Sequence, residues 1–496
     1  MRVFRNNIEK TIFFKTLILG VVLNFSLYIY LPYVMDIFFN LNSHFTPILE
    51  ANGRNLRIVL DNIVALIFKP FMVPYFSLLL SAIVYSYAFV LLYRYLNIED
   101  ENFRELFPYC IIFPCFTLLN PFYHDVTYYS INFLLSVVSF IVIVNFNKKY
   151  KYIIFLIIYL YILFIYQLNF FFIISLLFFD IVRKVLEGES IKRVILCGIK
   201  YFTAVVATIV VYSVLLKILN VGMYMRDAGF NIFNLLKTYA AFLILPFKDY
   251  MQINELLVSK ISILIIYLII LFLLLKVIKN DKYEKSVKLF LLFLIIIFPI
   301  AMNSVLLILK NPSRAMFAEL YLIIVPYFLI KYSDLNVKEN KIVNSVLFLS
   351  IIILVLSNFY TVNARYLELK NRNDAEKSWT IELVSTIKNT EGYSKDTKIV
   401  FLTQTEGNIS GKNLFDFYED YDYSRFGAEY ASSLLRYNYG EGLDLALNYY
   451  GAFKYNKVSK EEMESILNNS DVKNMPLYPS YGSVKRIDNI IIVKFY

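Results

Sequence analysis

A single acidic residue, Asp36, follows the first long apolar run, and Gly53, Arg54 and Arg57 come after it. Beyond Gly53 the apolar residues recur at helical spacing, which predicts an amphipathic helix on a membrane surface. A carboxylate there can accept the proton of an attacking hydroxyl, and an arginine can neutralise a departing phosphate. The alternative is that the arginines contact lipid headgroups and Asp36 caps or pairs locally.

Three further segments carry polar residues between apolar runs: the turn from Asn120 to Asp125, the pair Tyr166 and Gln167, and Arg314. The turn can hold a second catalytic acid, Asp125, or be an ordinary Asn-Pro turn. Gln167 suits a substrate contact or a hydrogen bond between helices, and Arg314 suits a phosphate or a headgroup. No metal site is predicted, although carboxylates could hold a divalent ion.

Composition restricts the class of protein strongly. Hydrophobic residues make up 58% of the 496 residues and charged residues only 18%. The net charge of +10 comes from short Lys and Arg clusters between apolar runs, so it predicts membrane topology and not nucleic-acid binding. The sequence has no phosphate-binding glycine loop, no dinucleotide fingerprint and no GxSxG motif, which excludes soluble nucleotide chemistry of those kinds.

Apolar runs predict about eleven membrane-crossing helices. They lie at 11–32, 71–95, 106–119, 126–146, 152–166, 169–182, 194–218, 258–276, 289–309, 315–331 and 342–360. Every second connection is basic, which places the N-terminus in the cytoplasm. The predicted site residues then all fall on exported connections, and everything after about residue 361 is also exported.

The segment 361–496 is nearly balanced in charge and resembles a soluble module. Strand-like runs at 398–402 and 490–495 and helical patterns near 374–389, 426–449 and 459–468 predict a small α/β domain. Ser459 and Glu462 fit a capping box at the start of the last helix. We therefore expect two domains, a polytopic membrane domain at 1–360 and an extracytoplasmic α/β domain at 361–496.

These motifs, in this order, resemble the bacterial Gtr-type (GtrII-like) glucosyltransferases of O-antigen and related surface polysaccharides. The matching features are Asp36, Gly53-Arg54, the Asn120–Asp125 turn, Tyr166-Gln167 and a closing segment that begins at Met475-Pro476-Leu477-Tyr478-Pro479. Two features depart from the family pattern. The acidic pair is reduced to Asp36, and Asn132 stands where an acid is expected.

The resemblance implies a GT-C-like α-helical membrane enzyme in the bacterial cytoplasmic membrane. It would move a sugar, typically glucose, from a polyprenyl-phosphate-linked donor to a lipid-linked or surface glycan on the outer side. Asp36 and Asp125 would be the catalytic candidates, and Gly53, Arg54, Arg57, Asn120, Tyr166, Gln167 and Arg314 would bind substrate. No cofactor is implied. A separate donor synthase and flippase would be functional partners, and the C-terminal domain would help to present the acceptor.

Three other readings of the sequence remain open. A related GT-C transferase could use another sugar or acceptor. A polysaccharide flippase or polymerase would need polar groups along a transbilayer path, which these apolar helices mostly lack. A non-catalytic membrane scaffold would be consistent with the reduced acidic pair.

Overall fold

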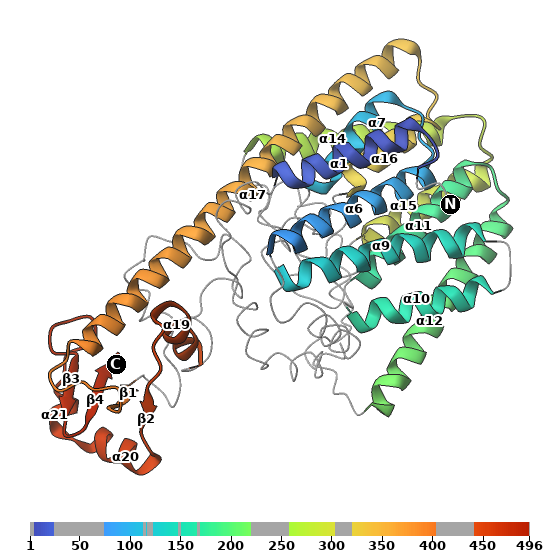
Figure 1. The fold of residues 1–496 in the computed structure, drawn as a ribbon. Coiled ribbons are helices and arrows are strands. Elements are labelled where there is room, and N and C mark those ends of the chain that lie inside the picture. The colour runs from blue at the N-terminus through green and yellow to red at the C-terminus, as the bar shows by residue number, and fades with distance from the viewer. Residues whose placement is uncertain are drawn as a thin grey trace. The chain divides into compact units, whose positions relative to one another are not determined.

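The computed structural model describes residues 4–23, 74–112, 116, 123–146, 150–165, 169–219, 257–302, 320–402 and 441–495. These residues form two compact units that divide between Arg365 and Tyr366. We refer to the part before this division as the helical unit and to the part after it as the C-terminal unit. Figure 1 shows the helices and strands of both.

The described part of the helical unit is built from helices. In chain order they are α1 (Asn7–Leu23), α6 (Pro74–Leu96), α7 (Glu101–Leu106), the 3₁₀ helix η1 (Phe107–Ile112), α9 (Tyr123–Asn145), α10 (Lys151–Ile165), α11 (Asn169–Leu186), α12 (Ile191–Ile218), α14 (Leu257–Lys279), α15 (Lys285–Met302), α16 (Tyr321–Ile330) and the start of α17 (Val337–Lys388). The predicted helical architecture is confirmed, since every predicted apolar segment overlaps one of these elements.

The predicted number of crossings is not confirmed. Within the described residues, five helices are long and apolar enough to cross a membrane: Phe76–Leu96, Val126–Asn145, Ile191–Ile218, Leu257–Lys279 and Val337–Ala364. Two shorter apolar helices, α10 and α16, do not reach the roughly twenty residues that a full crossing needs.

The predicted helix at 106–119 differs from the structure. The chain there forms the end of α7 and then the 3₁₀ helix η1, with buried Phe107 and Cys110. Pro108 explains the change, because proline has no N–H to donate to the carbonyl four residues earlier. Over residues 107–112 the chain forms a 3₁₀ helix where an α-helix was predicted, whereas Phe116 is α-helical and 113–115 and 117–119 lie outside the described residues.

The helices predicted separately at 342–360 and 374–389 are one continuous element, the 52-residue helix α17. The residues between them include no proline or glycine, and Lys370 pairs with Asp374 one turn later. Because this stretch contains good helix formers and a favourable i,i+4 pair, nothing in it ends the helix. The boundary between the two units therefore falls inside a helix and not in a loop.

Aromatic side chains form the centre of the helical unit. Phe89 of α6 lies 5.7 Å from both Phe107 of η1 and Phe133 of α9, measured between ring centroids. Phe133 in turn stacks on Phe172 of α11 at 4.8 Å. All four rings are at most 1% exposed. Such ring pairs add about 0.5–1.5 kcal/mol beyond the area they bury, so they fix how α6, α9 and α11 pack.

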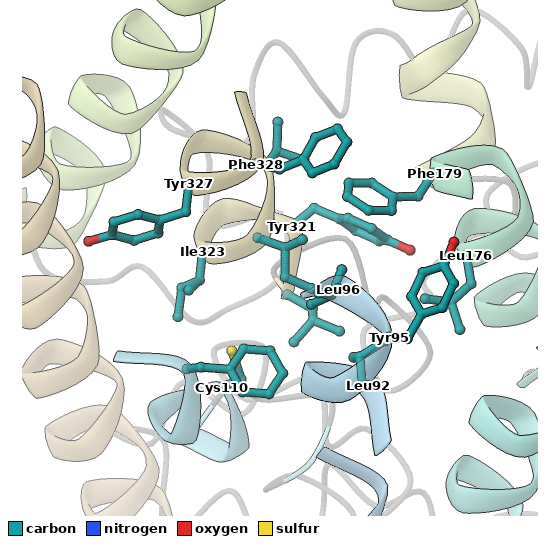
Figure 2. Packing of buried hydrophobic residues seen from close by; sticks show 14 of the residues in the cluster. Leu92, Tyr95, Leu96, Cys110, Leu176, Phe179, Tyr321, Ile323, Tyr327 and Phe328 are labelled. Carbon is teal, nitrogen blue, oxygen red and sulfur yellow. The ribbon is translucent and has the colours of Figure 1, made fainter. Parts of the chain in front are cut away.

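Helix α16 is buried on every side within the helical unit. Phe328 lies 4.7 Å from Phe179 of α11, Tyr327 lies 5.5 Å from Phe103 of α7, and the Tyr321 hydroxyl donates to Ser175 Oγ at 2.8 Å. Figure 2 shows Tyr321 and Phe328 on the side of Phe179. A ten-residue helix this apolar needs protein around it, because it is too short to span a bilayer.

The C-terminal unit contains a four-stranded sheet of order β2-β1-β4-β3. Its strands are β1 (Lys398–Leu402), β2 (Asn456–Lys457), β3 (Val484–Ile487) and β4 (Ile490–Lys494), and its helices after α17 are α19 (Glu441–Gly451), α20 (Lys460–Asn468) and α21 (Ser470–Lys473). Strand β1 pairs in parallel with β2 and β4, and β3 is antiparallel to β4. The two predicted strands are present as β1 and β4.

One face of this sheet packs against α20 and α21. Val400 and Ile492 are paired in register and share a buried cluster with Ile466 and Val472. The predicted capping box is confirmed: Ser459 Oγ accepts from the Glu462 N–H at 3.2 Å, and Glu462 accepts from the Ser459 N–H at 2.7 Å. These contacts fix where α20 begins.

Candidate functional site

Most of the predicted site residues lie outside the described residues: Asp36, Gly53, Arg54, Arg57, Asn120, Tyr166, Gln167 and Arg314. Asp125 is the exception. Its backbone is in the first turn of α9. The structure therefore places one predicted catalytic acid at a helix start and leaves the roles of all nine residues as predictions.

Two contacts show which helix ends surround the start of α9. Thr127 Oγ1 donates to the Ser77 carbonyl in the first turn of α6 at 3.4 Å. Asn132 Nδ2 donates to the Ile162 carbonyl near the end of α10 at 3.3 Å. Together with the Phe133–Phe172 stack, these contacts bring the starts of α6, α9 and α11 and the end of α10 to one end of the helical unit.

Three chain connections join these helix ends, and they carry every predicted site residue except Asp125 and Arg314. Residues 24–73 precede α6 and include Asp36 and the arginines, residues 117–122 lead into α9, and residues 166–168 join α10 to α11. These connections therefore meet the described helices at a common end. The side of the membrane that this end faces stays a prediction from the alternation of basic connections.

Four polar side chains of α9, those of Thr127, Ser130, Asn132 and Ser136, donate hydrogen bonds to backbone carbonyls. Ser130 donates to the Thr127 carbonyl at 2.8 Å and Ser136 donates to the Asn132 carbonyl at 2.7 Å. Asn132, where the resemblance leads us to expect an acid, is fully buried. A neutral amide suits such a position because an unpaired carboxylate would be costly to bury.

At the opposite end of the helical unit, a buried carboxylate is hydrogen-bonded or ion-paired to side chains of three helices. Asp180 of α11 is fully buried and accepts hydrogen bonds from Tyr95 of α6 and, at 2.8 Å, from Tyr201 of α12. Lys184 pairs with its second oxygen, and Arg183 lies 3.2 Å from its first oxygen and 4.5 Å from the Tyr95 ring centroid. Sequence reasoning missed this group, although a charge inside an apolar run was a usable signal.

A second ion pair lies on the same end of α6. Arg94 donates from Nε and Nη2 to the two carboxylate oxygens of Glu9 in α1, at 2.8 and 2.7 Å. Glu9 also accepts from the Arg5 N–H at 2.7 Å and is buried. A two-point arginine–carboxylate contact is strong and directional, so it ties α1 to α6.

The charged groups around Asp180 and Glu9 are thus occupied with one another. Each carboxylate faces arginine, lysine or tyrosine donors, which is the arrangement expected for structural ion pairs in an apolar bundle. Among the described residues, no group of three or more His, Cys, Asp or Glu side chains is placed to hold a metal. The side chains of the predicted acids Asp36 and Asp125 are not among those searched.

The long apolar helices and the buried aromatic bundle fit an α-helical membrane protein. A family model described as Glucosyl transferase GtrII matches residues 33–331, which is more than half of the chain. The chain belongs to this glucosyl transferase family. The suspected resemblance is thereby confirmed.

The limits of the match are informative. Every residue predicted for the site lies within residues 33–331, whereas the C-terminal unit lies beyond them. The closing segment that begins at Met475 is therefore not part of the match, and its resemblance to the family stays a prediction. No curated protein matches the chain. No solved structure matches it either.

Proposed function

We propose that this protein transfers a sugar, glucose in the first instance, from a polyprenyl-phosphate-linked donor to a surface or lipid-linked polysaccharide. Membership of the glucosyl transferase family implies a glycosyltransferase, and the apolar helices fit an enzyme of the membrane. We further propose that the reaction takes place on the outer side of the bacterial cytoplasmic membrane, with the N-terminus in the cytoplasm.

In the proposed reaction a hydroxyl of the acceptor glycan attacks the anomeric carbon of the donor. Asp36 or Asp125 accepts the proton of that hydroxyl, and the bond from the anomeric carbon to the phosphate oxygen breaks. Arg54 and Arg314 compensate the charge on the departing polyprenyl phosphate. Gly53, Arg57, Asn120, Tyr166 and Gln167 complete the proposed substrate contacts.

The observation that supports this site is the meeting of four helix ends in the helical unit. Three connections that carry Asp36 and most of the other predicted residues join the helices there, and Asp125 lies in the first turn of α9 at that end. The ion pairs of Asp180 and Glu9 are at the other end. A donor anchored in the bilayer by its lipid could present its phosphate at such an end of the bundle.

Sugar composition and linkage analysis of the surface polysaccharide tests this proposal. Cells without the gene should lose one side-branch sugar, and the wild-type gene should restore it. A double variant, Asp36→Asn with Asp125→Asn, should lower the transfer roughly 10²-fold or more, because general-base catalysis contributes at least that much. Protein abundance in the membrane should be unchanged.

Asp281→Asn serves as the matched control. Asp281 is an exposed carboxylate between α14 and α15, away from α9. This variant should restore the sugar fully. A polysaccharide that is identical with and without the gene, under conditions in which the protein is made, would rule out the proposed function.

A further inference from the structure

The C-terminal unit contains an open cleft of about 1360 Å³. It lies between the last turns of α17 and the segment from α21 to β3, and all of its lining residues belong to this unit. Clefts for drug-sized ligands have volumes of about 300–1,000 Å³. This cleft is large enough for a ligand made of several sugar-sized rings.

Two tyrosines give the cleft aromatic surface. Tyr481 has a relative exposure of 102%, so its ring is open to a ligand. Tyr478 is held from behind, with its ring centroid 5.7 Å from Trp379 and 5.6 Å from Phe495. An exposed tyrosine ring offers a flat apolar face beside a hydroxyl, which suits the C–H face of a sugar ring.

The Tyr478 hydroxyl is kept in its protonated form. Burial, and then the negative charge of Glu382, raise its pKa to about 12. At neutral pH the phenol is protonated, as an ordinary tyrosine also is, and it can donate a hydrogen bond.

The rest of the lining is dense in groups that bind hydroxyls. Asn389 and Asn474 carry amides that both donate and accept, and Glu382 and Asp471 carry carboxylates that accept. They come from α17 on one side and from the α21 segment on the other. A polyhydroxylated ligand can satisfy both kinds of group from a single ring.

The charge of the lining disfavours an anionic ligand. Among the described lining residues, carboxylates outnumber cations: Glu382, Glu391, Asp471 and Asp488 against Lys485 and Arg486. Arg486 is moreover engaged, since it donates to the Gly392 and Asp488 carbonyls at 2.7 and 2.9 Å and to Asn489 Oδ1 at 2.9 Å. A phosphate would meet net repulsion, whereas a neutral glycan would not.

The wall of the cleft is fixed by the last strand. Lys494 of β4 donates from Nζ to the carbonyls of Val472, Lys473 and Met475, at 3.1, 2.7 and 2.9 Å. A cation suits the end of α21, where carbonyls lack helical partners. These three bonds hold the segment that carries Asn474 in place, so the lining is preorganised.

We infer that this cleft binds a neutral oligosaccharide segment of the acceptor glycan, with Tyr481 stacking on a sugar ring and Glu382 and Asn474 binding its hydroxyls. The inference rests on the proposed function for the identity of the ligand.

The intrinsic fluorescence of a tryptophan next to this cleft can report ligand binding. Trp379 is the single tryptophan of the chain and packs against Tyr478 of the lining. Purified full-length protein is titrated with lipid-free surface polysaccharide from cells that lack the gene, and Trp379 fluorescence is recorded. Calorimetry with the same polysaccharide measures the affinity independently of fluorescence.

Wild-type protein should show saturable binding. Tyr481→Ala, and separately Glu382→Gln, should weaken binding roughly tenfold, whereas Tyr481→Phe should retain it. Glu464→Gln and Leu467→Ala are matched controls because both positions are exposed on α20 and neither lines the cleft. They should bind as wild type does.

The two proposals can fail separately. If the polysaccharide loses a sugar without the gene, but calorimetry detects no binding or Tyr481→Ala binds like wild type, the cleft does not hold the acceptor and the transferase proposal stands. If the polysaccharide is unchanged without the gene, the transferase proposal fails. In that case, if wild-type protein binds the polysaccharide and the Tyr481→Ala variant does not, the cleft is still established as a glycan-binding site.

Discussion

Asp180 shows how one buried carboxylate can hold several helices together. Its two oxygens receive hydrogen bonds or ion pairs from Tyr95, Tyr201, Arg183 and Lys184, which belong to α6, α11 and α12. Burying a charge is costly, and only such a set of donors makes it tolerable. Loss of the Asp180 carboxylate would leave these four donors without their common acceptor.

Replacement of Asp180 by alanine should therefore destabilise the helical unit by about 3–5 kcal/mol, because it leaves two cations in a largely buried place without their carboxylate. The free energy of unfolding is measured by titration with SDS in mixed micelles. Asp281→Ala, at an exposed position, should change it by less than about 0.5 kcal/mol. Equal effects of the two variants would contradict a structural role for Asp180.

Among the elements, α20 illustrates how local signals fix a helix. Its capping box was readable from the sequence because the residues involved are three positions apart. The structure adds a partner that the sequence does not reveal: Lys398 of β1 donates to Glu462 Oε1 at 2.6 Å. One carboxylate thus caps α20 and joins it to the sheet.

This carboxylate should give the C-terminal unit an acid-sensitive contact. The hydrogen bond from Lys398, and then the backbone bond from Ser459, lower the pKa of Glu462 below its ordinary value of 4.5. A lowered pKa in the folded state means that the stabilisation is present above pH 4.5 and is lost as the pH falls through the folded-state pKa.

Hydrogen exchange of the α20 amides in the full-length protein measures this effect between about pH 7 and pH 3, after correction for the intrinsic exchange rate. Glu462→Gln should lower protection at neutral pH, and its difference from wild type should shrink toward the acid end. Glu464→Gln, without these partners, should follow wild type. A constant difference at all pH values would show that ionisation of Glu462 is not responsible.

The sequence predicted those helices and strands that form because of the residue pattern within their own segment. Apolar runs located the helices, and short strand-like runs located β1 and β4. The sequence-based prediction was wrong at two places where a single residue type determines the helix. Pro108 favours the 3₁₀ helix η1, and the absence of proline or glycine after residue 360 lets α17 continue. Contacts such as Thr127 with Ser77 depend on packing between distant segments, so no local pattern reveals them. The cleft was missed for the same reason.

At the scale of the whole molecule, the alternation of basic connections makes one topological prediction. The connection between α14 and α15 should face the cytoplasm, and the C-terminal unit should be exported. Single cysteines test this in a background where Cys110, Cys115 and Cys197 are alanine. In intact spheroplasts an impermeant maleimide should label Leu467→Cys at once, but Asp281→Cys only after permeabilisation. The reverse pattern would invert the topology and move the proposed site to the cytoplasmic side.

The burial of α16 has a consequence for how the protein is made. This helix lies at residues 321–330, yet its contacts reach α7 and α11, which leave the ribosome much earlier. Until α16 arrives, the surfaces of Phe103 and Phe179 that it covers lack their final partner. The helical unit can therefore complete its folding only after the chain has been translated past Ile330, and the family match ends one residue later, at 331. A nascent chain halted before that point would be inserted but unfinished, a substrate for the membrane's quality-control proteases.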